Sequence, residues 1–289
     1  MAIDISIILC CRNEAENIRE QLDALAGQSW RKPWELIVSD NGSTDGTQDI
    51  VEDYRSLLPN LVLIDSSDRT GPGHARNAAI AAARGDKLLF CDADDVVGPG
   101  WLDAMADGLE QHDFVACRAD FVKLNPSWLL AARNGTQESG PQSYDYPPFL
   151  PHAAGGTIGV RRYWHERIGG IDETMLRLSD TDYCWRLQLA GAALHFVSEA
   201  VVYYRLRPDM KTTCRQARLW GEYNVVLYKK FRRCGMPKLS PVTGIRNWLG
   251  LLRRAIYLTK SESRPEWLWD ISWATGRLIG SIKYRVFAL

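Results

Sequence analysis

The sequence predicts an α/β fold with a mostly parallel central sheet, because strand-like and helical patterns alternate along its N-terminal part. The strand-like runs are short and apolar, and segments with helical spacing separate them. The predicted strands are 3–10, 35–39, 61–65 and 87–91, and the predicted helices between them are 14–26, 45–54 and 74–83. This order indicates a Rossmann-like sheet with flanking helices.

The first predicted helix follows directly on the first strand. Asn13 is expected to be its N-cap, and Glu16, three residues later, is the expected capping-box partner. Three apolar residues then recur at helical spacing and define one buried face: Ile18, Leu22 and Leu25.

The composition indicates a globular protein. The chain has 289 residues, of which 46% are hydrophobic, enough for one large domain and an appendage. Its apolar runs are far shorter than the roughly 18 uncharged residues of a membrane-spanning helix. The seven cysteines lie mostly in apolar stretches, which favours buried free thiols. We therefore expect a cytoplasmic protein.

Charge divides the chain into two parts. Residues 1–202 contain 17 Lys and Arg against 30 Asp and Glu, a net charge of −13, whereas residues 203–289 contain 18 against 5, a net charge of +13. We expect a domain of residues 1–204 and a basic extension of residues 205–289, with helices near 215–232, 245–258 and 267–284. Within the domain, residues 140–156 are rich in Pro, Gly and aromatics and predict a loop beside the ligand-binding edge.

Acidic residues gather where predicted strands end. Asp40 ends the second strand, and Asp92-Ala93-Asp94 follows the fourth. Ligands of open α/β sheets bind at the carboxyl ends of the strands, so these residues are expected to face one cleft. If the segment is extended, Asp92 and Asp94 lie on one side, about 7 Å apart, where both reach a single Mg²⁺ or Mn²⁺. Taken alone, the pattern is equally typical of solvated carboxylates in a turn.

A later helix is expected to open at Ser179. Ser179 is the predicted N-cap and Asp182 its capping-box partner, which places Asp180 in the same first turn. The helix dipole is expected to lower the pKa of Asp180 and keep it ionised. The alternative is that both carboxylates only stabilise the helix start, and for Asp182 we favour this role.

The ordered combination of segments resembles glycosyltransferase family two. The matching segments are 6–14, 35–47, 71–77, 92–94, 169–173 and 180–187, so the resemblance extends over about residues 3–206. It implies the A-type glycosyltransferase fold, a nucleotide-diphosphate sugar donor, a divalent metal and inversion at the anomeric carbon. The expected acceptor is a lipid-linked or soluble glycan, and no nucleic-acid partner is expected.

Residue roles follow from the resemblance, position by position. Asp94 corresponds to the direct metal ligand, and Asp92 to the carboxylate near ribose and metal. Asp180 corresponds to the general base that deprotonates the acceptor hydroxyl. The expected nucleotide contacts are Cys11, Arg12, Glu14, Asp40, Arg76, Asp92 and Ala93.

The sequence departs from the family pattern at three places. Ser179 stands where many relatives have a glutamate before the base, so the surroundings of Asp180 differ. Tyr203-Tyr204-Arg205 stands where many have a histidine, so no third protein ligand of the metal is assigned. Cys10-Cys11 occupies the usual polar position of the first loop, which favours backbone contacts there.

Two other functions compete with glycosyl transfer. Residues 88–97 also fit the strand and Asp-x-Asp of haloacid-dehalogenase-type phosphatases, with Asp92 as nucleophile, although there the motif ends the first strand. A non-catalytic carbohydrate-binding scaffold on the same fold is the other alternative. A dinucleotide oxidoreductase is excluded, because Arg76 stands where the third glycine of the fingerprint belongs.

For the basic extension the sequence suggests peripheral contact with the inner face of a membrane. Basic pairs such as Arg232-Arg233 and Arg253-Arg254, together with aromatic residues, motivate this hypothesis. The aromatic residues are Trp267, Trp269, Trp273 and Tyr284. The equal alternative is a helical lid or dimer surface.

Overall fold

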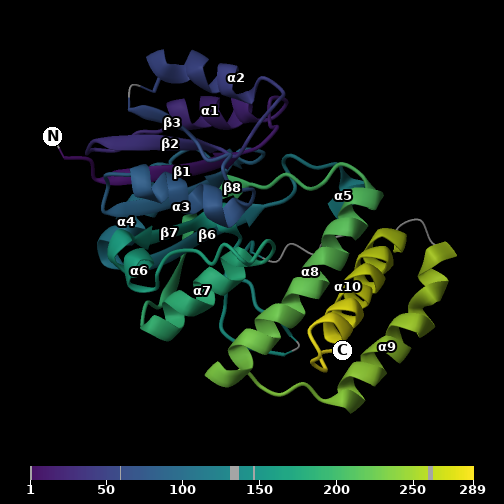
Figure 1. The fold of residues 1–289 in the computed structure, drawn as a ribbon. Coiled ribbons are helices and arrows are strands. Elements are labelled where there is room, and N and C mark those ends of the chain that lie inside the picture. Colours follow the sequence, from purple (N-terminus) through teal and green to yellow (C-terminus); the bar gives the residue numbers. More distant parts are fainter. Residues whose placement is uncertain (1, 59, 131–136, 146, 260–262) are drawn as a thin grey trace. The chain divides into compact units, whose positions relative to one another are not determined.

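The computed structural model describes residues 2–58, 60–130, 137–145, 147–259 and 263–289, which form two compact units (Figure 1). Unit 1 runs from the N-terminus to Asp120 and includes residues 137–142 and 151–204. Unit 2 contains the described parts of 121–136 and 143–150, and all those of 205–289.

Within the described residues, unit 1 is built on an eight-stranded sheet with the order β3-β2-β1-β4-β7-β6-β8-β5. The first four are mutually parallel, β7 is antiparallel to β4 and β6, β8 is parallel to β6, and β5 is antiparallel to β8. The predicted mostly parallel sheet is therefore confirmed. The strands are β1 (Ile5–Cys11), β2 (Trp34–Asp40), β3 (Leu61–Asp65), β4 (Lys87–Asp92), β5 (Val96–Val97), β6 (Phe114–Asp120), β7 (Ile158–Arg161) and β8 (Leu194–Tyr203).

Helices cover both faces of this sheet. Alternate residues of β1 and β4 point to opposite faces. One set packs against α1, α2 and α4, and the other against α3 and α7. The helices of unit 1 are α1 (Ile18–Ala26), α2 (Thr47–Asp53), α3 (Pro72–Ala82), α4 (Trp101–Gln111), α6 (Arg162–Arg167) and α7 (Ser179–Ala190), with 3-10 turns η1 (Tyr54–Ser56) and η2 (Gly155–Thr157).

The predicted start of the first helix is wrong. Helix α1 begins at Ile18, four residues after the predicted start, and no side chain caps it. Asn13 instead adopts a left-handed conformation with φ of 56°. Its Oδ1 accepts a hydrogen bond from the backbone N–H of Thr44 at 2.8 Å, and its own N–H donates to Ser43. The backbone N–H groups of Glu14 and Ala15 likewise donate to Thr47 and Asp45, so residues 13–15 are held to the neighbouring loop and the regular helix begins only at Ile18.

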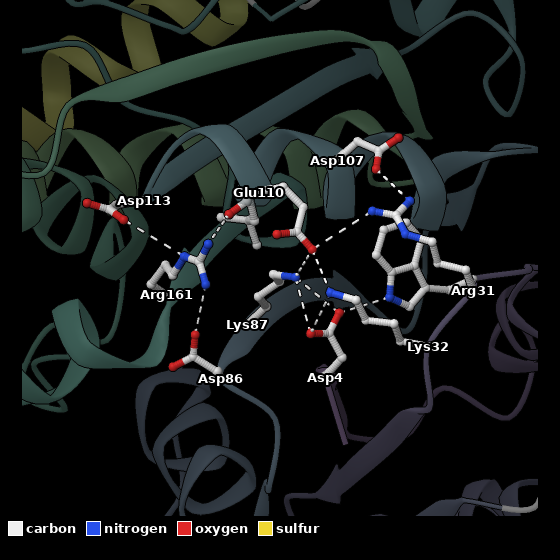
Figure 2. A network of polar contacts seen from close by, with 11 residues as sticks. Asp4, Arg31, Lys32, Asp86, Lys87, Asp107, Glu110, Asp113 and Arg161 are labelled. Carbon is white, nitrogen blue, oxygen red and sulfur yellow. Dashed lines mark hydrogen bonds and ion pairs between the residues drawn. The ribbon is translucent and has the colours of Figure 1, made fainter. Parts of the chain in front are cut away.

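An ion cluster around the buried side chain of Lys87 lies at the amino ends of β1 and β4 (Figure 2). Lys87 is only 2% exposed, and its Nζ lies 3.0 Å from Asp4 and 2.7 Å from Glu110. Lys32 approaches the same carboxylates from the surface. Hydrogen bonds from Lys32 and Lys87 lower the pKa of Glu110 to about 2, so its carboxylate stays charged. The cluster therefore lies at the amino ends of these strands, and Asp92 lies at the opposite, carboxyl end of β4.

Replacement of Lys87 by methionine is expected to lower the free energy of unfolding by about 3 kcal/mol, because two carboxylates lose their buried counter-ion. Lys32→Met is the matched control: it removes a cation from the same carboxylates, but its side chain is 43% exposed. We expect that variant to cost less than about 1 kcal/mol. Urea denaturation followed by circular dichroism measures both, and equal losses would contradict the structural role of Lys87.

Unit 2 is mainly helical. Helices α8 and α10 run side by side at very close distance (Figure 1). A Cβ on Gly276 would lie 1.9 Å from the carbonyl oxygen of Arg218, so glycine is required at this contact. The elements are α5 (Ser127–Leu130), α8 (Met210–Phe231), η3 (Arg232–Cys234), α9 (Pro241–Arg253), η4 (Arg254–Thr259) and α10 (Arg264–Lys283).

The three tryptophans that motivated the membrane hypothesis make contacts within unit 2: Trp267 is buried, and Trp269 and Trp273 are half-buried. Trp267 is 8% exposed and donates a hydrogen bond from Nε1 to the carbonyl of Leu251 at 3.0 Å. The ring of Trp269 packs edge-on against Trp220. The ring of Trp273 lies tilted against that of Tyr144, with centroids 6.0 Å apart. Each of these rings therefore contacts other residues of unit 2, and the hypothesis of peripheral membrane contact stays a prediction.

Two further properties concern the whole described chain. No helix among the described residues is long and apolar enough to cross a membrane. All seven cysteines are free thiols, which confirms the prediction from their positions.

Candidate active site

Three neighbouring parallel strands end together at one edge of the sheet. Cys11 of β1 pairs with Asp40 of β2, and Cys10 of β1 pairs with Asp92 of β4. Side chains alternate along a strand, so Asp40 and Asp92 point to opposite faces of the sheet. The two carboxylates thus lie at the predicted edge of the sheet but on opposite faces, whereas the sequence predicted that both face one cleft.

Asp40 is buried at the end of β2 in a network of donors. Its Oδ2 accepts hydrogen bonds from the backbone N–H of Gly42 and Ser43 and, at 2.7 Å, from Gln48. The thiol of Cys11 lies 3.6 Å from its Oδ1. Burial raises the pKa of Asp40, but hydrogen bonds from Ser43 and Gln48 outweigh burial, and the net pKa is lowered. Asp40 is only 1% exposed, and these donors together with the Ser43 hydroxyl engage both of its oxygens, so a base N–H group would have to displace one of them.

The first loop holds the other predicted nucleotide contacts. The backbone N–H of Glu14 donates to Thr47 Oγ1 at 2.9 Å, and its side chain accepts from Asn17. Arg12 is exposed. Burial raises the pKa of Cys10 to about 12, so this thiol stays protonated. The loop therefore offers backbone groups and the exposed Arg12 next to Asp40.

Asp92 forms a close ion pair with Arg76 on α3. Arg76 Nη2 lies 2.6 Å from Asp92 Oδ1, and Arg76 is only 9% exposed. Two glycines pack directly on this pair. A Cβ on Gly155 would lie 2.7 Å from Arg76 Nη2, and one on Gly156 would lie 2.9 Å from Asp92 Oδ2. Residues 155–156 thus hold the pair in place, and larger residues do not fit.

Ala93 and Asp94 lie in a turn and not in an extended segment. Strand β4 ends at Asp92, and the backbone N–H of Asp95 donates to the carbonyl of Asp92. The alternation expected for a strand therefore does not apply here, and the predicted spacing of Asp92 and Asp94 along an extended chain is wrong. Ala93 is buried, whereas Asp94 is half-buried.

The residues at this turn carry the type of ligand atom that a divalent cation prefers. Carboxylate oxygens are the ligands that Mg²⁺ and Mn²⁺ prefer, and Asp94 supplies two of them in the turn. Asp92 already engages Arg76 through Oδ1, so it has less capacity to bind a metal. No group of three or more His, Cys, Asp or Glu side chains is arranged around one point among the described residues. A cation there would need ligands from the substrate.

Asp180 lies in the first turn of α7, and both of its oxygens accept backbone hydrogen bonds. Oδ2 accepts from Gly155 N–H at 3.1 Å, and Oδ1 from Thr181 N–H at 2.8 Å. Burial raises the pKa of Asp180, and the two N–H groups and Arg76 only partly offset this effect. The expected lowering of this pKa by the helix dipole is therefore wrong, because loss of solvation is the larger effect.

The start of α7 also differs from the prediction. Ser179 is the first helical residue, and the N-cap is Leu178, which has φ of 55° and provides no side-chain cap. Asp182 is fully buried and binds Arg186 at 2.7 Å, so it is not a capping-box residue. The left-handed conformation of Leu178 could not be predicted, because leucine rarely adopts it.

A small pocket opens between Arg76 and Asp180. Backbone and side chains of two sheet strands and α7 line it, together with the glycine segment. The lining residues are Arg76, Phe90, Gly155, Ile158, Ile171, Ser179, Asp180 and Tyr183. Ser179, which replaces the glutamate usual in the family, therefore faces the same space as the proposed base.

The segment 169–173 holds α3 in position. Asn77 of α3 donates hydrogen bonds at 2.9 Å to the carbonyl of Ile171 and to Glu173. Glu173 also binds Arg69 at 2.6 Å and His74 at 3.2 Å. These contacts fix the helix that carries Arg76.

Sequence reasoning missed the residues that organise the loop beside the site. Gln137 is fully buried and donates to the carbonyl of Cys117 and to Thr157, and its Oε1 accepts from Ala154 N–H. Gly155 and Gly156 were assigned only to the end of the 140–156 loop, of which residue 146 lies outside the described residues. The Gly-Gly pair directly before a strand was the available signal, since such pairs often mark a close approach of backbone.

Gly155→Ala is expected to displace Arg76 from Asp92 and to reduce turnover. The added methyl group would also cost about 1–3 kcal/mol of folding stability, because the neighbouring side chains must move. Gly140→Ala is the control, since nothing lies within 4 Å of a Cβ there. Steady-state kinetics and thermal unfolding of both variants test this prediction, and two equally active variants would refute the packing role of Gly155.

Comparisons with known proteins identify the family of this chain. The family model described as Glycosyl transferase family 2 matches residues 6–169. The pre-mycofactocin glycosyltransferase of Mycobacterium tuberculosis is 26% identical over 227 residues, which cover 75% of this chain and 46% of that protein. Glycosyltransferase AglE of Haloferax volcanii is 27% identical over 231 residues, covering 79% of this chain and 71% of that protein. The chain thus spans about half the length of the first of these relatives.

Solved structures share the fold. The mannosyltransferase PcManGT of Pyrobaculum calidifontis, determined with GDP-Man and Mn²⁺, superposes with a TM-score of 0.65 at 20% identity, over 96% of this chain and 88% of that chain. Residues 1–349 of Staphylococcus aureus TarS with UDP give a TM-score of 0.58 at 19% identity, over 99% of this chain and 93% of that chain. Because the family model matches more than half of this chain, the chain belongs to glycosyl transferase family 2.

Proposed function

We propose that the protein transfers a sugar from a nucleotide-diphosphate donor to an acceptor hydroxyl, with inversion at the anomeric carbon. The observation that carries the proposal is the position of Asp180. Its carboxylate is oriented by two N–H groups, its pKa is raised, and it lines a pocket together with Arg76. Family membership excludes the phosphatase alternative.

The donor nucleotide is assigned to the carboxyl edge of β2, β1 and β4. Asp40 accepts N–H groups of the base, and Cys11, Arg12 and Glu14 contact base and ribose from the first loop. PcManGT, which shares the fold, was determined with GDP-Man, and TarS with UDP. These complexes support a nucleoside diphosphate as the ligand of this site, but they do not favour a particular base. Arg76, as part of the Asp92 pair, positions that carboxylate against the ribose.

A divalent cation, Mn²⁺ or Mg²⁺, is proposed at Asp94 with support from Asp92. Bound there, it would neutralise charge on the leaving diphosphate. The presence of Mn²⁺ in the PcManGT complex supports this choice.

Asp180 is proposed to remove the proton of the acceptor hydroxyl during attack. The acceptor oxygen forms a bond to the anomeric carbon while the bond from that carbon to the diphosphate oxygen breaks. The proton passes to Asp180, and the diphosphate leaves with the electron pair. Burial of Asp180 serves this step, because a carboxylate with a raised pKa is a stronger base than a solvated one.

The two parts of the chain are proposed to have different roles. Residues 1–204 bind the donor and carry the chemistry, and the loop 140–156 contributes to the acceptor side. The basic extension 205–289 serves as a peripheral membrane contact, a helical lid or a dimer surface. The acceptor is a glycan, either lipid-linked or soluble, and seven free thiols support a cytoplasmic location.

A calorimetric screen of uridine, guanosine and thymidine diphosphates with Mn²⁺ tests the donor site. We expect one of them to bind in the presence of Mn²⁺ and to bind far more weakly in the presence of a chelator. Absence of binding by all three would argue against a nucleotide-sugar donor site of this kind. Asp40→Asn is expected to weaken binding of the preferred nucleotide and leave its metal dependence intact.

A further inference from the structure

Helix α9 of unit 2 presents an apolar stripe to solvent. Val242, Ile245, Leu249 and Leu252 follow one another at intervals of three, four and three residues, and their exposed fractions are 75%, 56%, 50% and 55%. Residues at these intervals lie on one face of a helix. Ile256, 64% exposed, extends the row into η4. These five residues are called the α9 stripe.

The rest of α9 shows that this exposure is specific to one side. Gly244 and Leu251 are buried against the remainder of unit 2. A Cβ on Gly244 would lie 2.6 Å from the backbone oxygen of Leu289. The carbonyl of Leu251 accepts the Trp267 hydrogen bond. The helix is thus anchored through its inner face, and the α9 stripe lies on its outer face.

Cations border the α9 stripe. Arg246 and Arg253 are both exposed, and at 100° per residue they lie on the same flank of the stripe. Helix α9 contains no Asp or Glu. The nearby acidic residues Glu266 and Asp270 of α10 are engaged by Arg254. The stripe is therefore apolar in its centre and positively charged at its margin.

We propose that the α9 stripe is a docking surface for an anionic lipid membrane, with the helix lying in the plane of the interface. Apolar side chains enter the acyl boundary, and the arginines meet lipid phosphates, as in other interfacial helices. A second copy of this chain fits less well. Two stripes packed together would bring Arg246 and Arg253 of both copies close to one another, and α9 offers no carboxylate to compensate.

Flotation of the full chain with lipid vesicles at about 0.15 M ionic strength tests this proposal. We expect binding to phosphatidylcholine vesicles that contain phosphatidylglycerol and little binding to phosphatidylcholine alone. The variant with Ile245→Ser and Leu252→Ser, and separately the variant with Arg246→Gln and Arg253→Gln, should each lose at least about tenfold in affinity. Leu57→Ser is the matched control, because Leu57 is 62% exposed but lies in unit 1, and it should bind as the wild type does.

Three outcomes would overturn the proposal. They are failure of the wild type to float with anionic vesicles, unchanged binding by the serine variant, and a dimer in light scattering that the serine variant converts to monomer. All substitutions are at exposed positions, and circular dichroism establishes that each variant folds. Binding is measured without donor or acceptor, so failure here leaves the proposed transferase function standing, and failure of transferase activity leaves this proposal standing.

Discussion

Asp180→Asn is expected to reduce turnover by about 10²–10⁴-fold while donor binding is retained, because the amide cannot take up the proton of the acceptor hydroxyl. The variant should stay folded. Asparagine removes a buried charge but loses one acceptor for the N–H groups of Gly155 and Thr181, and these effects oppose each other. Steady-state kinetics measures turnover, and calorimetry with the nucleoside diphosphate measures donor binding separately.

Asp103→Asn is the matched control, since Asp103 also lies in the first turn of a helix, α4. If Asp180 only stabilised a helix start, the two variants would behave alike. Normal turnover by Asp180→Asn would refute its role as the base.

The raised pKa of Asp180 also predicts a pH profile. The base acts only when ionised, so turnover of the wild type should fall as the pH drops through a value above 3.8, the ordinary pKa of the group. For folding the sign is opposite: because the folded pKa is raised, protonated Asp180 favours the folded state, and this contribution is lost as the pH rises through the folded pKa. In Asp180→Asn the acid limb assigned to this group should disappear.

Asp94→Ala is expected to weaken donor binding in Mn²⁺ by at least about 100-fold, more than loss of a typical outer-shell partner of a metal site. Binding in the presence of a chelator should be unchanged, because the side chain acts only through the cation. Calorimetric titrations with and without Mn²⁺ measure both.

Asp92→Ala provides the comparison for Asp94→Ala. Asp92 also neutralises the buried Arg76, so this variant should lose folding stability as well as metal-dependent binding. If Asp94→Ala retained the full effect of Mn²⁺, the assignment of the metal to this turn would be refuted.

The first four strands and a mostly parallel sheet could be predicted from the sequence. Apolar runs such as those around Leu36 and Leu89 are buried on both faces, and their alternation with helical patterns leaves few topologies. The places of Asp40 and Asp92 at strand ends followed directly. Their separation onto opposite faces could not be predicted, because a shift of one residue in the pairing of two strands moves a side chain to the other face.

Local starts of helices could not be predicted so well. Asn13 and Leu178 both take left-handed conformations, and in each case the capping pattern expected from the sequence is not formed. The pKa of Asp180 depended on the burial that Gly155 and α3 produce together. The exposed apolar face of α9 could be identified only from the structure, because the aromatic residues that the sequence analysis considered lie outside α9.

Release of nucleoside diphosphate from a panel of uridine, guanosine and thymidine diphosphate sugars tests the central claim most directly. The reaction is followed with Mn²⁺ and a glycan acceptor, and the anomeric configuration of the product is read by nuclear magnetic resonance. We predict metal-dependent release from at least one donor, an inverted product, and loss of product formation in Asp180→Asn. Donor binding without release from any sugar nucleotide would identify a carbohydrate-binding scaffold and contradict this account.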